Sequence, residues 1–227
     1  MELPASIALL PIWYVVFLLS LTCHEAAHAW AARRGGDPTA YLGGQVTLNP
    51  LPHVMREPIG MIGVPLLTYF MNGWMMGWAS APYDPYWEDR HPRRAAAMAA
   101  AGPLANLALA ALAFAGLKAG LAAGWFGPPE SLAYDRLVAG AAGAEGIGRA
   151  LSVLLVLNLL LAVFNAIPLP PMDGASVLAG FVPPLRELKD RLRGSPLASL
   201  AGLVLAWTLF PYVFHPVLRF TLALLYA

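Results

Sequence analysis

Two histidines and a glutamate lie close together in residues 22–29, TCHEAAHA, directly after a stretch without any charged residue. His24 and His28 are four positions apart, so on a helix their imidazoles share one face and can reach one ion. The pattern His-Glu-x-x-His is typical of zinc sites in which the glutamate acts as a general base. The segment therefore predicts a zinc ion held by His24 and His28, with Glu25 as the base.

The surroundings of this segment are apolar. Hydrophobic residues make up 59% of the 227 residues and charged residues only 12%, about half of the usual charged share. The mean hydropathy of +0.61 agrees, and we expect a polytopic membrane protein. A charged group near the centre of a bilayer costs roughly 2.5–3.5 kcal/mol, so ionisable residues in such a helix are expected to have a function. The net charge of +1 argues against a nucleic-acid partner.

A catalytic zinc needs a third protein ligand and an open position for water. The candidate lies far along the chain, in residues 165–174, NAIPLPPMDG. Its three prolines exclude a regular helix, and Gly174 permits a sharp turn after Asp173. Alone, this segment would be an ordinary loop in which Asp173 caps a helix. Together with the histidine pair, it predicts Asp173 as the third zinc ligand.

Five apolar stretches must position these residues: 5–34, 58–79, 94–123, 148–166 and 197–226. The second is broken by glycines and a proline and can either span the bilayer or return as a re-entrant hairpin. If it returns, ten of the fourteen Lys and Arg residues share one side, which the positive-inside rule makes cytoplasmic. We therefore expect an all-α membrane protein with four spanning helices, a hairpin at 58–79 and the N-terminus outside.

Residues 41–48 stand apart from these helices. They alternate between polar and apolar around Gln45, with glycines before and a proline after, which predicts a short membrane-associated β segment. Such a strand could pair with an unwound substrate by strand addition. The chain is expected to form a single membrane-embedded domain over 1–227, with a core at 5–182 and a C-terminal helix at 197–226.

Three motifs, taken together, resemble the site-2 protease family of intramembrane zinc metalloproteases. They are HEAAH, then AAAGPLANLALA at 99–110, then FNAIPLPPMDG, in the order of that family. The segment GGQVTLNPLPH also resembles the glycine-rich membrane-associated segment of bacterial members. The family's last motif often reads Leu-Asp-Gly, where this chain has Met172, Asp173 and Gly174. We find no PDZ-like or CBS-like domain in the sequence, as in a compact member of the family.

The resemblance implies that His24, His28 and Asp173 bind one Zn²⁺ and that Glu25 activates water. It also implies supporting or substrate-binding roles for Asn165 and Asn106, of which Asn165 is the better candidate for substrate contact. The implied reaction is hydrolysis of a peptide bond in or near the transmembrane segment of a single-pass protein, such as an anti-sigma factor. The implied location is the bacterial inner membrane, with the active site towards the cytoplasm.

Two other functions fit the same residues. Histidines and acids within helices can carry ions, so a membrane metal transporter is one alternative. A non-catalytic binder of membrane helices is another, although the intact Glu25 argues against it. Of the remaining histidines, His53 is expected at the surface, with a role as a cavity residue or extra ligand left open, and His215 is expected to be structural or interfacial.

Overall fold

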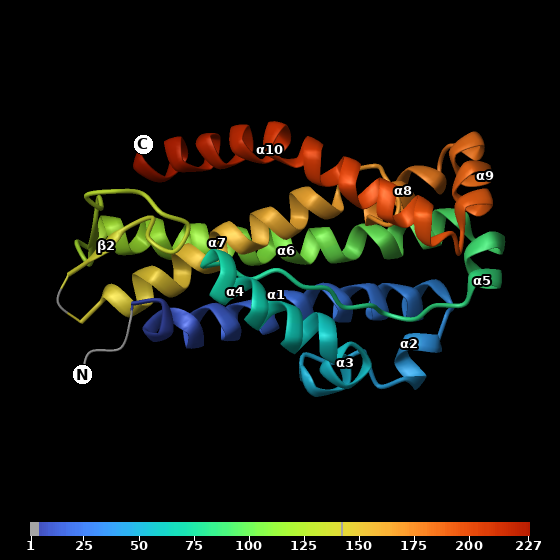
Figure 1. Cartoon of the computed structure of the whole chain (residues 1–227), viewed down its shortest axis with the longest axis horizontal. Coiled ribbons are helices and arrows are strands. Elements are labelled where there is room, and N and C mark those ends of the chain that lie inside the picture. Colours follow the sequence, from blue (N-terminus) through green and yellow to red (C-terminus); the bar gives the residue numbers. More distant parts are fainter. Residues whose placement is uncertain (1–4, 142) are drawn as a thin grey trace.

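A computed structural model describes residues 5–141 and 143–227, without the side chains of residues 5 and 6. Four long helices run along its length (Figure 1): α1 (Ala5–Gly35), α6 (Pro92–Ala122), α7 (Glu145–Asn165) and α10 (Pro196–Tyr226). In the described part of the chain, these four are long and apolar enough to cross a membrane. The chain is thus an all-α integral membrane protein, as predicted.

Shorter elements connect the long helices. They are α2 (Thr39–Leu42), α3 (Leu51–Arg56), the π-helical turn η1 (Ile59–Gly63), α4 (Val64–Asn72), α5 (Pro85–Arg90), α8 (Asp173–Ala179) and α9 (Pro183–Leu192). Two short strands, β1 (Phe126–Gly127) and β2 (Ala139–Gly140), pair antiparallel between α6 and α7.

The core is a three-helix unit in which α6 packs against both α1 and α7. Phe17 of α1 and Val153 and Leu157 of α7 meet in one buried cluster, while Leu117 of α6 belongs to a second one. The fourth helix, α10, covers α7 through aromatic contacts such as Phe164–Phe210, 5.5 Å between ring centroids. Most of its own surface is exposed, as expected of a helix that faces lipid.

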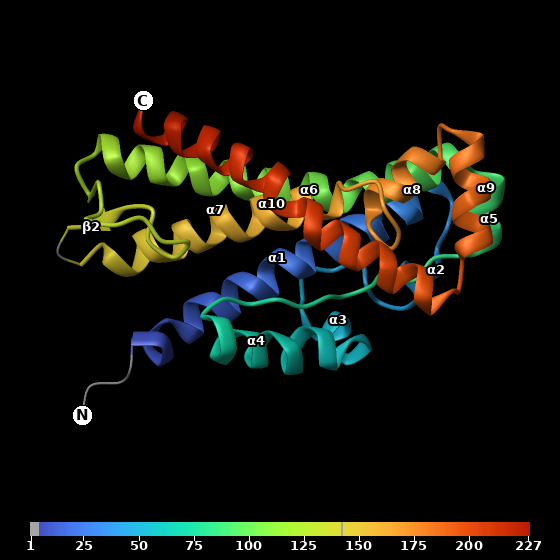
Figure 2. The same ribbon diagram turned by 45° about the horizontal axis from the view of Figure 1, so that its top comes forward.

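Residues 58–79 form a hairpin, as predicted. The apolar helix Ile59–Asn72 is too short to cross a bilayer, and the chain reverses at Gly73, whose φ of +76° is one that glycine adopts readily. The returning segment runs extended beside the helix (Figure 2), where the Trp78 amide donates to the Gly60 carbonyl at 3.2 Å. A second bond joins the Met76 amide to Thr68 Oγ1 at 2.9 Å.

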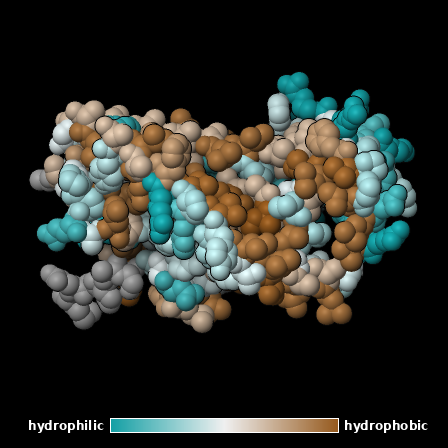
Figure 3. Space-filling model, turned by 90° about the horizontal axis from the view of Figure 1, so that it is seen from above, coloured by the Kyte–Doolittle hydropathy of each residue, from teal (hydrophilic) through white to brown (hydrophobic). Residues whose placement is uncertain are grey.

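The two ends of the bundle differ in charge. The described N-terminal residues, the C-terminus and the β1–β2 connection lie at one end, whereas α2, α5, α8 and α9 lie at the other. The second end carries Arg33 and Arg34 at the close of α1 and the basic residues of α9. Figure 3 shows hydrophilic side chains gathered there. The chain enters the hairpin from α2 and α3 and leaves it towards α5, so both of its limbs connect to the basic end, as the charge distribution predicts.

The predicted β segment at 41–48 is wrong, because no strand forms there. The helix α2 ends at Leu42, and turns and bends follow. Thr47 Oγ1 accepts from the Asn49 amide and Asn49 Oδ1 accepts from the Leu51 amide, both at 3.0 Å. Such local bonds compete with a β ladder, and Gly44 turns the chain at a φ of +73°. The strand-addition hypothesis for these residues therefore loses its basis.

An ion-pair cluster at the basic end joins α5 to α9. Glu88, whose side chain is 11% exposed, pairs with Lys189 Nζ and, at 3.1 Å, with the Arg193 guanidinium. Burial, together with the Glu88 carboxylate, raises the pKa of the neighbouring Tyr83 to about 12, so this phenol stays neutral. Since α9 follows α8, which begins at Asp173, the cluster fixes the segment that carries the predicted third ligand.

We expect Glu88→Ala to lower the free energy of unfolding by about 1.5–3 kcal/mol, because it removes the carboxylate that pairs with the largely buried Lys189 and one of the three carboxylates that pair with Arg193. Unfolding in detergent measures this change. Asp89→Ala is the matched control, since this carboxylate is 51% exposed and exposed ion pairs contribute about 0–1 kcal/mol. Equal losses for the two variants would contradict a stabilising role of the cluster.

Candidate metal centre

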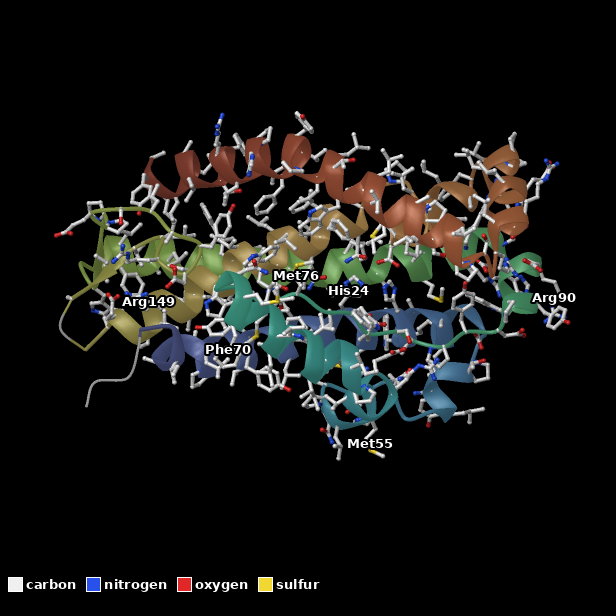
Figure 4. The ribbon with its side chains drawn as sticks, viewed as in Figure 1. His24, Met55, Phe70, Met76, Arg90 and Arg149 are labelled. Carbon is white, nitrogen blue, oxygen red and sulfur yellow. The ribbon has the colours of Figure 1, made fainter. Side chains whose placement is uncertain are left out.

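The two histidines of α1 converge as their spacing predicts. His24 and His28 are buried, with 4% and 8% of their surfaces exposed. Their rings meet edge to face, with centroids 4.6 Å apart and planes at 83°, and their Nε2 atoms are 3.0 Å apart. Figure 4 shows His24 in the interior of the bundle, between α1 and α6.

The third predicted ligand reaches the same point from α8. Asp173 Oδ2 lies 3.2 Å from His24 Nε2 and 3.4 Å from His28 Nε2. Asp173 is the first residue of α8, whose start packs tightly on the end of α7: a Cβ at Gly174 would lie 2.3 Å from the Ala166 carbonyl oxygen. The proline-rich segment thus holds the carboxylate against the histidine pair.

The proton positions in this cluster can be derived from its partners. His28 Nδ1 lies 2.8 Å from the Met98 carbonyl oxygen, which can only accept, so this nitrogen carries the proton. His24 Nδ1 lies 2.6 Å from Asn106 Oδ1, also an acceptor. Both Nε2 atoms therefore present lone pairs to each other and to Asp173.

These donor atoms fit a bound cation. The two Nε2 atoms and the Asp173 carboxylate oxygen lie within 4.8 Å of one another, and Asp173 Oδ2 is buried without a hydrogen-bond partner among the described residues. Tetrahedral zinc with bonds of about 2.0–2.1 Å would separate its ligand atoms by about 3.3–3.4 Å. The observed separations of 3.0–3.4 Å are close to this value.

Asp173 contributes the one carboxylate of this donor set, and each imidazole that carries its proton on Nδ1 is a neutral ligand. An ionised carboxylate with two neutral imidazoles is the ligand set that zinc accepts in hydrolytic enzymes.

Space for the cation depends on a glycine of α6. A Cβ at Gly102 would lie 2.4 Å from His28 Nε2 and 2.6 Å from His24 Nε2. Only a residue without a side chain leaves the two nitrogens free at this position. Gly102 belongs to the AAAGPLANLALA motif, yet its spacing alone does not reveal this role.

The other predicted residues differ in how they relate to this centre. Glu25, 4% exposed, is buried directly beside His24 in the sequence. Asn106 contacts His24, whereas Asn165 lies at the end of α7 and donates to the Leu161 carbonyl at 2.9 Å. Contact of Asn165 with the substrate stays a prediction. The asparagine that contacts a proposed zinc ligand is Asn106.

The two remaining histidines named above do not join the metal cluster found in the described residues. His53 is 1% exposed and lies 3.2 Å from the Thr47 carbonyl oxygen through Nε2, so the expected surface position is wrong. Thr47 lies in the turns and bends that follow α2, and the sequence does not signal that this segment contacts His53. His215 is exposed on α10 and packs beside Phe214.

We expect Gly102→Ala to lower the zinc affinity at least tenfold, because the added methyl occupies the space between the two imidazoles. Gly116→Ala on the same helix is the control, since its Cβ would meet only the flexible Leu151 side chain at 3.3 Å. Competition with a chelator measures the affinity, and the unfolding midpoint checks that both variants fold. Wild-type affinity in Gly102→Ala would refute the proposed position of the ion.

Comparisons with known proteins assign the chain to a family. The family model of Peptidase family M50 matches residues 12–209. The chain is 35% identical over 179 residues to "Putative zinc metalloprotease YwhC" of Bacillus subtilis (strain 168), covering 78% of this chain and 72% of that protein.

Two further relatives carry the name "Putative zinc metalloprotease Rip2". The protein of Mycolicibacterium smegmatis is 30% identical over 162 residues, and that of Mycobacterium tuberculosis (strain ATCC 25618 / H37Rv) is 31% identical. Each match covers 71% of this chain and 54% of the relative. No solved structure matches. The chain belongs to peptidase family M50, the site-2 protease family, and is a membrane metalloprotease.

Proposed function

We propose that this protein is a zinc-dependent intramembrane protease that acts in regulated intramembrane proteolysis. The observation that carries the proposal is the convergence of His24, His28 and Asp173 inside a bundle of membrane helices. A soluble protein does not enter the bilayer and would not reach a site at this depth. The transmembrane segment of another protein already lies at this depth. Single-pass membrane regulators, such as anti-sigma factors, are the proposed substrates.

The residues divide the chemistry between them. Zinc held by His24, His28 and Asp173 would polarise the scissile carbonyl and lower the pKa of a bound water molecule. Glu25 follows His24 on α1 and has the residue type to take the proton from the attacking water and pass it to the leaving amine. Asn106 and the Met98 carbonyl hold the two imidazoles with their Nε2 lone pairs towards the ligand cluster. Peptide hydrolysis needs each of these functions.

Replacement of the proposed base tests the mechanism. We expect Glu25→Gln to bind zinc like the wild type and to cleave a single-span substrate in detergent about 10²–10⁴-fold more slowly. Glu187→Gln on α9 is the control, because this carboxylate is 71% exposed. Cleavage and bound zinc are measured on the same preparations.

Each outcome distinguishes one function. Zinc bound by both variants, with cleavage lost only in Glu25→Gln, is the result expected of the protease. Full cleavage in Glu25→Gln would refute the role of Glu25. Zinc uptake into vesicles without any cleavage by the wild type would instead establish the transporter, and neither uptake nor cleavage would favour a binder of membrane helices.

The proposed location is the bacterial inner membrane, with the basic end of the bundle in the cytoplasm and the N-terminus outside. The support is the gathering of basic residues on α5, α9 and the end of α1. The histidines lie in the second half of α1 and Asp173 precedes α9, so both halves of the metal centre lie towards that end.

Labelling of single cysteines tests this orientation in a background that lacks Cys23. A membrane-impermeant maleimide is expected to label Glu130→Cys, in the connection before α7, on intact spheroplasts. It is expected to label Glu187→Cys only after the membrane is opened. Both positions are exposed in the structure, so access depends on the side of the membrane. The reverse pattern would overturn the orientation.

A further inference from the structure

A chain of buried polar side chains crosses the three-helix core. It consists of Ser20 on α1, Asn106 on α6 and Asn158 on α7, each with 0% of its surface exposed. Polar groups in an apolar interior must be paired with one another, since no water is available there. Asn158 lies among the leucines and valines of α7, and in the described structure its hydrogen bonds go to Ser20, Leu154 and Asn106 and not to a proposed zinc ligand or Glu25.

The hydrogen bonds of Asn158 fix its orientation. Its Nδ2 donates to Ser20 Oγ at 2.8 Å and to the Leu154 carbonyl oxygen at 2.8 Å, which uses both amide protons. Ser20 Oγ donates in turn to the Val16 carbonyl oxygen at 2.7 Å. The Asn158 oxygen is therefore left to accept, and it points at Asn106.

The hydrogen bonds of Asn158 determine the orientation of the Asn106 amide. Its Nδ2 donates to Asn158 Oδ1 at 2.8 Å and to the Ser20 carbonyl oxygen at 3.2 Å, so both of its amide protons are used as well. Only Oδ1 is left to face His24, and an amide oxygen can only accept. The proton between them must lie on His24 Nδ1, 2.6 Å away, and the Nε2 lone pair is then available to a metal.

A comparison with His28 shows why the partner of His24 needs further hydrogen bonds to fix its orientation. His28 Nδ1 donates to the Met98 carbonyl oxygen, which belongs to the backbone of α6 and cannot exchange its role. The partner of His24 is a side-chain amide, which can rotate by half a turn and present a donor instead. A donor in that place would favour the tautomer with its proton on Nε2, the nitrogen that must bind zinc.

We propose that Asn158 is a positioning residue that fixes the metal-binding tautomer of His24 through Asn106. It acts from a third helix, without touching the ion or the substrate. The part of the inference that concerns zinc rests on the proposed function, whereas the tautomer of His24 is a property of the metal-free chain.

Two substitutions at one position separate orientation from packing. Asn158→Leu keeps the approximate volume and removes the acceptor for Asn106, so we expect a mixture of His24 tautomers and a 10- to 100-fold loss of zinc affinity. Asn158→Asp keeps an acceptor facing Asn106, and its protonated form can donate to Ser20 or Leu154. We expect Asn158→Asp to keep the wild-type tautomer and a zinc affinity within about threefold of wild type.

The readouts are ¹⁵N chemical shifts of histidine side chains in the metal-free protein in detergent, and zinc affinity by chelator competition. Ser152→Ala is the control for loss of a buried hydrogen bond on α7, because Ser152 bonds Gly148 and Leu137 and lies outside the chain of three. We expect this variant to keep both the tautomer and the affinity.

If Asn158→Leu and Asn158→Asp both lose the wild-type His24 tautomer and zinc affinity, position 158 serves packing alone. This result would overturn the proposal. An unchanged tautomer in Asn158→Leu would overturn it as well. If Asn158→Leu does not fold, Asn158→Asp decides, since loss of the tautomer there contradicts an orienting acceptor. A wild-type chain that binds no zinc but keeps the Nδ1-protonated His24 would refute the proposed function and leave the tautomer inference standing.

Discussion

Three atoms that each present a lone pair point at one another in the interior of this protein. The Nε2 atoms of His24 and His28 and the Oδ2 of Asp173 lie 3.0–3.4 Å apart, and their other partners place the imidazole protons on the far side of each ring. Without a cation this arrangement is electrostatically unfavourable, most of all in an apolar medium. The surrounding structure is arranged to maintain it.

Each of the core helices contributes something different to this arrangement. The first helix, α1, carries two ligands and Glu25. The middle helix, α6, supplies the room at Gly102 and both acceptors, through Asn106 and the Met98 carbonyl. The third, α7, supplies Asn158, whose Oδ1 accepts a hydrogen bond from Asn106. This helix ends where the segment that carries Asp173 begins. The site therefore cannot be assigned to any one segment, although its most conspicuous motif lies on one helix.

The sequence predicted those features that depend on length, spacing or charge. The four spanning helices follow from the length of their apolar stretches, and the hairpin follows from its breaks and from the position of the arginines. The convergence of His24 with His28 follows from the helical repeat. Asp173 followed from the need for a third ligand and from the resemblance, because nothing local in its loop distinguishes a ligand from a helix cap.

Features that depend on contacts between helices could not be predicted in this way. The sequence gives no measure of how closely α6 approaches α1, and this approach is what assigns Asn106 to His24. Asn158 did carry a signal, an amide in the middle of the apolar stretch 148–166, but its side-chain partners lie on two other helices. The prediction of a strand at 41–48 was wrong because it rested on a short alternation of polar and apolar residues. It did not take into account the local hydrogen bonds that the side chains of Thr47 and Asn49 accept.

The close approach of Gly102 to both histidines bears on how sequences of this kind should be interpreted. A relative can retain His-Glu-x-x-His and the distant aspartate and still have no room for an ion, if the position that corresponds to Gly102 carries a side chain. Such a protein would keep the membrane fold and its contacts with other helices without hydrolysing anything. A search that counts only ligands would class it as a protease, whereas the middle helix would identify it as a pseudoenzyme.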